Sequence, residues 1–142
     1  MREILFKAKR IDNGEWVEGY YIRDQYHIGG KDIIFYRKDS DRFTVYTNII
    51  DIETLCQFTG LCDKNGKKIW ENDIVNYNGE YAPVKFGMYC SSFDYGSCNF
   101  GFYVDFPEET FYRKELGYWH RKIETAGNVF DNPELLQEES DE

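Results

Sequence analysis

The sequence predicts a mostly β fold, a barrel or sandwich of short antiparallel strands with one or two short helices at its margin. Short segments of alternating apolar and polar residues recur along the 142 residues, and several are joined by Asn-Gly turns. Aromatic residues, which favour strands, make up 18% of the chain. Many short strands with tight turns are typical of barrels and sandwiches. The length is that of one domain, and we expect it to span residues 1–137.

The first half of the chain contains four strand candidates. The first two alternate in polarity and flank Asn13-Gly14, a strong signal for a hairpin turn. The next two are rich in β-branched and aromatic residues and flank the polar turn at residues 39–41. The four predicted strands cover residues 4–10, 16–22, 33–36 and 43–49.

The second half contains six more strand candidates. Asn65-Gly66 and Asn78-Gly79 predict further turns, and Pro83 suggests an edge position for its strand. The predicted strands cover residues 55–61, 68–70, 73–77, 81–86, 99–106 and 124–130. In the strand at 99–106, strict alternation predicts that one row of side chains faces the core, namely Phe100, Phe102, Val104 and Phe106.

Two short helices are predicted near the end of the chain. One would begin at Pro107, with acidic residues in its first turn, and would stop at Gly117. The other would begin at Asn132 as N-cap, with Pro133 in the first helical position.

The charge is acidic and unevenly distributed. The formal net charge is −9, from 17 basic and 26 acidic side chains. Residues 1–70 carry 12 basic and 11 acidic side chains, whereas residues 71–142 carry 5 and 15. Nucleic-acid binding depends on Lys and Arg neutralising phosphates, so this balance argues against it. Acidity that promotes solubility is the simpler interpretation. The last five residues, 138–142, have nothing apolar to bury and are expected to form a frayed tail.

The four cysteines indicate neither a zinc site nor a set of disulfides. Cys56, Cys62, Cys90 and Cys98 lack the C-x2-4-C spacing of structural zinc sites. The first residues contain no apolar secretory segment, so we expect free thiols rather than disulfides. Asp63-Lys64-Asn65-Gly66 begins like a calcium loop but lacks its later ligands, and a turn is the better interpretation. We therefore expect no metal and no cofactor.

No catalytic set is evident, and we expect the protein not to be an enzyme. His27 and His120 are the only histidines, and no serine lies in a G-x-S-x-G motif. A Cys–His pair, with Cys90 or Cys98 near His120, is possible by composition but has no local support. No apolar run approaches the ~20 residues of a membrane span.

Two small clusters are candidates for binding. Tyr89, Phe93 and Tyr95 lie among Ser, Gly and Asp residues, a composition used in protein-binding loops because Tyr offers large contact area at low entropy cost. Such rings can equally fold onto their own domain. Three lysines beside Trp70 could contact nucleic acid, although Trp70 fits a core position equally well; they are Lys64, Lys67 and Lys68.

Three stretches of the sequence resemble the YopX family of phage and prophage proteins. Residues 57–75, QFTGLCDKNGKKIWENDIV, are similar to the central signature of that family. Residues 2–8 and 126–136, REILFKA and AGNVFDNPELL, are similar to its beginning and end. Asn72 stands where glycine is usual, and Asn tolerates the same left-handed conformation.

The resemblance implies a β-rich fold with a small SH3-like barrel and a phage or prophage origin. It implies no established activity. We expect a location in the bacterial host cytoplasm. We therefore expect a non-enzymatic accessory protein that binds a host or phage protein, through a barrel surface or the loop at residues 88–98. Self-association through exposed sheet edges is also possible. The alternative is an acidic nucleic-acid mimic, or a barrel that binds nucleic acid weakly.

Overall fold

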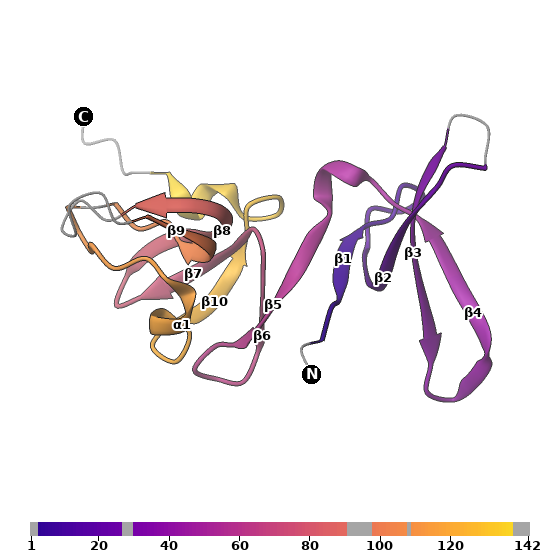
Figure 1. Ribbon diagram of the computed structural model, residues 1–142, viewed down its shortest axis with the longest axis horizontal. Helices are drawn as coiled ribbons and strands as arrows, with labels where there is room; N and C mark the ends of the chain where they lie inside the picture. Colours follow the sequence, from indigo (N-terminus) through magenta and orange to yellow (C-terminus); the bar gives the residue numbers. More distant parts are fainter. Residues whose placement is uncertain (1–2, 27–29, 91–97, 108, 138–142) are drawn as a thin grey trace. The chain divides into compact units, whose positions relative to one another are not determined.

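The protein is mostly β, as the sequence predicts. The computed structural model describes residues 3–26, 30–90, 98–107 and 109–137. The chain divides into two compact units, Met1–Phe58 and Thr59–Glu142 (Figure 1). The expectation of one domain over residues 1–137 stays a prediction. The expected tail at 138–142 lies outside the described residues.

The first unit is an antiparallel meander. Its strands are β1 (Phe6–Lys9), β2 (Trp16–Asp24), β3 (Lys31–Lys38) and β4 (Asp41–Ile49). They are ordered β4-β3-β2-β1, and β1 also pairs with the start of β5 (Cys56–Cys62). A short 3-10 helix, η1 (Ile52–Thr54), lies between β4 and β5. The predicted turn after β1 is present, and Gly14 has the positive φ of 72° that favours glycine there.

The core of the first unit is small. Ala8, Ile34 and Ile50 are buried, and Phe6 and Tyr21 are among the side chains that pack against them. An isolated bridge pairs Arg10 with Ile50, so the end of β4 lies beside the end of β1. In β2 the exposed residues Glu18, Tyr20 and Ile22 alternate with more buried ones. In β3 the half-buried Ile33 and Phe35 flank the buried Ile34, so the fully buried core lies on one face of the meander.

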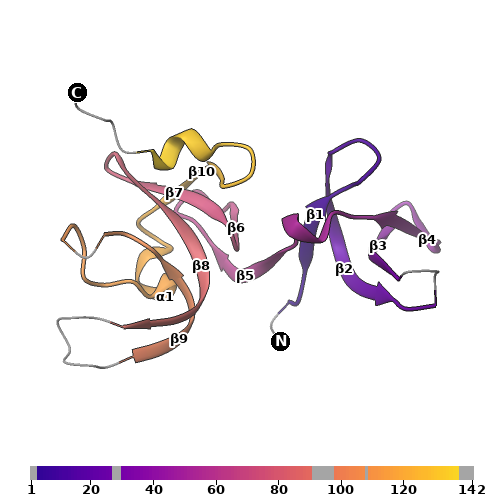
Figure 2. The same cartoon turned by 90° about the horizontal axis from the view of Figure 1, so that it is seen from above.

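The second unit contains a four-stranded antiparallel sheet, visible from two directions in Figures 1 and 2. The order is β10-β7-β8-β9, with β10 (Glu124–Asn128), β7 (Asp73–Tyr77), β8 (Glu80–Cys90) and β9 (Cys98–Val104). The chain also forms β6 (Lys68–Trp70), α1 (Leu116–Trp119) and the 3-10 helix η3 (Pro133–Leu136). At the turn between β7 and β8, both predicted residues have positive φ, 51° for Asn78 and 90° for Gly79.

A larger core fills the second unit. Val84 of β8 and Val104 of β9 are fully buried, and α1 adds Leu116 and Trp119. Four side chains are predicted to face inward from a strand at residues 99–106. Of these, Val104 at the end of β9 and Phe106 just after it are buried. Phe102 is half-buried, and the prediction for Phe100 is wrong because its side chain is 70% exposed.

One predicted helix is misplaced. The N–H groups of Thr110 and Phe111 donate to the carbonyl of Pro107, and the N–H of Val104 donates to the carbonyl of Lys114. This strand-like pairing occupies the segment where the helix was expected, so α1 begins only at Leu116 and Gly117 lies inside it. The strand pairings of the described residues form open sheets, in which β9 and β10 are edges, and the SH3-like barrel stays a prediction.

Candidate functional site

The first unit carries an apolar face that its own core does not cover. Because side chains alternate along a strand, the residues between the buried positions of β2, β3 and β4 point to the opposite face. Register places Tyr20 opposite Phe35, and Ile33 opposite both Ile22 and Ile49. We define the exposed face of the first unit as seven uncharged residues: Tyr20, Ile22, Ile33, Phe35, Val45, Thr47 and Ile49.

This face is large and contains a hollow. Tyr20 is 53%, Ile22 49% and Val45 45% exposed, and the rings of Tyr20 and Phe35 contact with centroids 5.6 Å apart. A hollow of about 540 Å³ is lined by five of these seven residues, Ile22 and Phe35 among them, and by residues 23–26, which add the charged Arg23 and Asp24. Contiguous exposed apolar surface of this kind marks interaction sites in folded proteins. The arrangement can bind apolar groups, and its seven residues contain no acid, base or nucleophile apart from hydroxyl groups.

Two lysines lie over an aromatic ring on the same side of the first unit. The Nζ atoms of Lys7 and Lys9 lie 4.9 and 5.5 Å from the ring centroid of Trp16. Register pairs Lys9 with Trp16 and Lys7 with Glu18. Trp16 and Glu18 lie on the same face of β2 as Tyr20, because side chains alternate along a strand. The edge of the exposed face therefore combines an aromatic ring with both signs of charge.

The predicted binding loop is only partly described. Phe93 and Tyr95 lie outside the described residues, so their role stays a prediction. Tyr89 is not in a loop but in β8, where its ring contacts that of Tyr103 with the ring centroids 4.9 Å apart. Burial, together with the negative charge of Glu115, raises the pKa of the Tyr89 hydroxyl.

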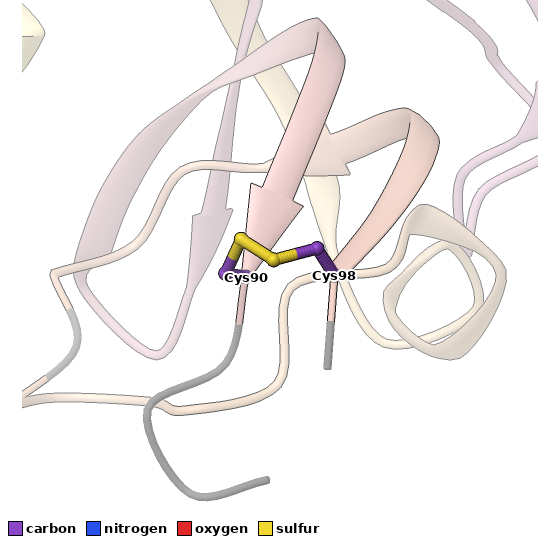
Figure 3. The surroundings of a disulfide bond; sticks show 2 residues. All are labelled: Cys90 and Cys98. Atoms are coloured by element: carbon purple, nitrogen blue, oxygen red, sulfur yellow. A yellow bond between two sulfur atoms is a disulfide. The ribbon is translucent and has the colours of Figure 1, made fainter. Parts of the chain in front are cut away.

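The expectation that all four cysteines are free is wrong. Cys90 and Cys98 form a disulfide between the end of β8 and the start of β9, with Cα atoms 4.1 Å apart (Figure 3). Antiparallel pairing places the two residues directly opposite each other, which their sequence spacing alone does not reveal. Cys56, which is buried, and Cys62, which is exposed, form no disulfide.

The calcium-like turn is a structural turn. One carboxylate oxygen of Asp63 accepts hydrogen bonds from the N–H groups of Asn65 and Lys67, at 2.9 and 3.0 Å. The other accepts from the N–H and hydroxyl of Thr125, at 2.9 and 3.1 Å. Burial alone would raise the pKa of Asp63, but these donors outweigh it and the pKa is lowered. The four donors occupy the carboxylate, which is consistent with a turn rather than an ion site.

The neighbouring lysines do not form a platform for bases. Trp70 is only 5% exposed and belongs to the buried hydrophobic residues. The Nζ of Lys64 lies 4.0 Å from a carboxylate oxygen of Glu124. The single aromatic residue of that predicted cluster is therefore not accessible for stacking.

His120 is the one histidine that the structure describes, and its contacts among the described residues do not suggest catalysis. A ring nitrogen of His120 lies 3.0 Å from the backbone carbonyl of Cys62. Cys90 and Cys98 are oxidised, so neither is a free thiol for His120 to activate. His27 lies outside the described residues. Within the described ranges, no group of three His, Cys, Asp or Glu residues could hold a metal ion, and no helix could span a membrane.

Two other signature positions also have structural roles. Asn72 adopts a φ of 71°, so the left-handed turn expected there is present without glycine. A Cβ on Gly127 would overlap the side chain of Asn132, whose oxygen accepts from the N–H of Asn128. Glycine is required at 127 because the carboxamide lies against its Cα.

These observations define a mostly β protein with an exposed apolar sheet face and a disulfide-closed hairpin. The family model described as YopX protein matches residues 5–137, and the chain belongs to the YopX family. It is also similar to the crystal structure of protein EF1440 from Enterococcus faecalis, with a TM-score of 0.50 and 20% sequence identity. That similarity covers 96% of this chain and 100% of the other, and it concerns the fold alone. No curated protein matches this chain.

The exposed face was not predicted from the sequence, although the sequence contains a signal for it. β3 is apolar at four successive positions, Ile33 to Tyr36, and a strand with one solvated face normally alternates. Such a run predicts either a strand covered on both sides or one with an apolar face open for binding.

Proposed function

We propose that this protein is a non-enzymatic, phage- or prophage-encoded accessory protein that binds a host or phage protein through the exposed face of the first unit. The observation that carries this proposal is the continuous apolar surface over β2, β3 and β4. The proposed location is the bacterial cytoplasm.

Several physical features support a protein partner. Burial of apolar surface is the main favourable term in protein association, at roughly 25 cal/mol per Å². Tyr20 and Phe35 offer stiff aromatic anchors beside the hollow, and aromatic residues are enriched at the centres of interfaces. The absence of charge from the seven residues avoids the cost of desolvating ions at such a centre.

The test compares two exposed apolar positions. Ile22→Asp places a charge in the exposed face of the first unit, whereas Met88→Asp does the same at a 68% exposed position of the second unit. Each variant and the wild-type chain would be used to capture partners from host lysate, and captured proteins would then be titrated in purified form. We expect the affinity to fall at least about 100-fold for Ile22→Asp, since a buried unpaired charge costs several kcal/mol. Met88→Asp should bind like wild type.

Equal binding by the two variants would contradict the proposal. Because Ile22 is half exposed, Ile22→Asp should keep the wild-type circular dichroism spectrum and melting temperature, and loss of either would make Ile22→Ser the variant to use. Light scattering tests for self-association, because it measures the mass of the protein in solution. If wild type has twice the 16.9 kDa mass of one chain and only Ile22→Asp does not, the partner at this face is a second copy.

A weak nucleic-acid contact is the second candidate. It is favoured by the ammonium groups of Lys7 and Lys9 over the Trp16 ring. Lysine can hold a phosphate group, and an aromatic ring beside it can stack on a base. Fluorescence polarisation with a single-stranded oligonucleotide at two salt concentrations tests it. Binding that weakens with salt and is lost in Trp16→Ala would support this candidate, and no binding at low salt would exclude it.

A further inference from the structure

The β8–β9 hairpin extends beyond the core of the second unit as a two-stranded arm. Seven register pairs join the strands, from Val84 opposite Val104 at the base to Cys90 opposite Cys98 at the tip. The base is anchored, because both valines are fully buried. Towards the tip, Phe86, Met88 and Phe100 are 48%, 68% and 70% exposed.

The disulfide and the exposed apolar side chains lie on one face of this arm. Side chains alternate along a strand, so Phe86, Met88 and Cys90 share a face, and register adds Cys98 and Phe100 to it. The Phe86 ring contacts Phe100 with centroids 5.1 Å apart. The opposite face differs: Gly87 pairs with Gly101, and the rings of Tyr89 and Tyr103 meet beside them.

We propose that Cys90 and Cys98 form a reversible redox site, which exchanges with low-molecular-weight thiols and controls the order of the apolar face at the tip of the arm. Both residues are exposed, so a small thiol can reach the bond. Exposed disulfides are the labile ones, whereas buried structural disulfides resist reduction.

The chemistry of the exchange balances with such a thiol. A thiolate attacks one sulfur of the disulfide, a mixed disulfide forms, and the other cysteine leaves as a thiolate. A second thiol then attacks the mixed disulfide and releases the small-molecule disulfide. The protein gains two electrons and two protons, and two small thiols are oxidised to one disulfide.

The position of the bond makes the change local. The base of the arm is held by the core and by Lys85, whose Nζ lies 3.0 Å from a carboxylate oxygen of Asp105. The tip has fewer restraints, because Met88 and Phe100 are largely exposed. Reduction should therefore loosen the pairs near Met88 and leave the pair of Val84 with Val104 intact.

The test begins with equilibration of the full chain in mixtures of glutathione and glutathione disulfide. Free thiols would be alkylated under native conditions and located by peptide mass spectrometry. We expect Cys90 and Cys98 to change together from oxidised to alkylated within the accessible range of mixtures. Cys62 gives the reference for an exposed thiol outside the pair. If the pair stays oxidised in a 100-fold excess of reduced glutathione, or never forms in glutathione disulfide, the proposal is wrong.

Hydrogen exchange then tests the structural consequence. On reduction, the amides of Met88 to Cys90 and Cys98 to Phe100 should exchange about tenfold faster, while those of Val84 and Val104 should not change. The Cys90→Ser/Cys98→Ser double variant should match the reduced chain under all conditions, and Cys62→Ser should behave like wild type. Unchanged exchange at the tip, or loss of protection at Val84, would each overturn the proposal of a local switch.

Discussion

Replacement of Asp63 by asparagine should destabilise the second unit by about 3 kcal/mol. The carboxylate accepts four hydrogen bonds, two at each oxygen, from Asn65, Lys67 and Thr125. An asparagine keeps one oxygen and turns the other into a donor, so two donors lose their acceptor and face an NH2 group. A buried donor left unsatisfied costs about 1–3 kcal/mol, and two such donors give about 3 kcal/mol even with partial relaxation.

Urea unfolding at pH 7, followed by tryptophan fluorescence, measures this loss. With an m-value of about 1–3 kcal/mol/M, the midpoint of the transition of the second unit should fall by roughly 1–3 M. Glu80→Gln is the matched control, because it makes the same change from carboxylate to amide at an exposed position of the same unit, and it should stay within about 0.5 kcal/mol of wild type. A loss below about 1 kcal/mol for Asp63→Asn would refute the reasoning.

The same residue predicts a pH dependence. The pKa of Asp63 is lowered in the folded chain by its donors, against the opposing effect of burial. Its contribution is therefore fully present above the unfolded pKa of about 3.9 and is lost as the pH falls through the folded pKa. The stability difference between wild type and Asp63→Asn should shrink below pH 4. A difference that stays constant down to pH 2 would show that the charge of Asp63 is not what its donors stabilise.

Two further substitutions test the structure elsewhere. Gly127→Ala should lower the free energy of unfolding by about 2 kcal/mol, because the new Cβ would overlap the side chain of Asn132. Gly117→Ala is the control, since the space at its Cβ is open, and it should change the melting temperature little. Equal melting temperatures for the two variants would contradict this prediction. Ile34→Ala should lower the stability of the first unit by about 3 kcal/mol, because it opens a cavity in the core of that unit. The second unit should keep its stability, since its buried residues form a separate cluster. Amide hydrogen exchange measures both, and equal loss of protection in the two units would contradict the prediction.

Most strands could be predicted because their turns are local. The hairpin at Asn78-Gly79 needs two residues with positive φ, and few residue types other than Asn and Gly adopt it. The turn at Asp63 is equally local, since Asn65 and Lys67 satisfy half of its carboxylate. These signals require no knowledge of the rest of the chain, and the structure contains both turns.

What the sequence did not predict depends on contacts between distant segments. The segment near Lys114 has helical composition, but its carbonyl accepts from Val104, and this pairing competes with a helix. The disulfide depends on the register of β8 against β9, and a shift of one residue would separate Cys90 from Cys98. The exposed face was missed because alternation shows which residues share a face and cannot show which face the core covers.

The family signature and the proposed binding face lie in different parts of the chain. Residues 57–75 and 126–136 form the turns at Asp63, Asn72 and Gly127, and all three have hydrogen-bonding or conformational roles in the second unit. The exposed face lies between residues 20 and 49, outside these stretches, and its side chains are not needed to satisfy any of those turns. A fold can keep its structural residues while an exposed sheet face changes, because surface substitutions cost little stability. Variants of the exposed face should therefore separate binding from folding, whereas variants of the signature turns should affect folding first.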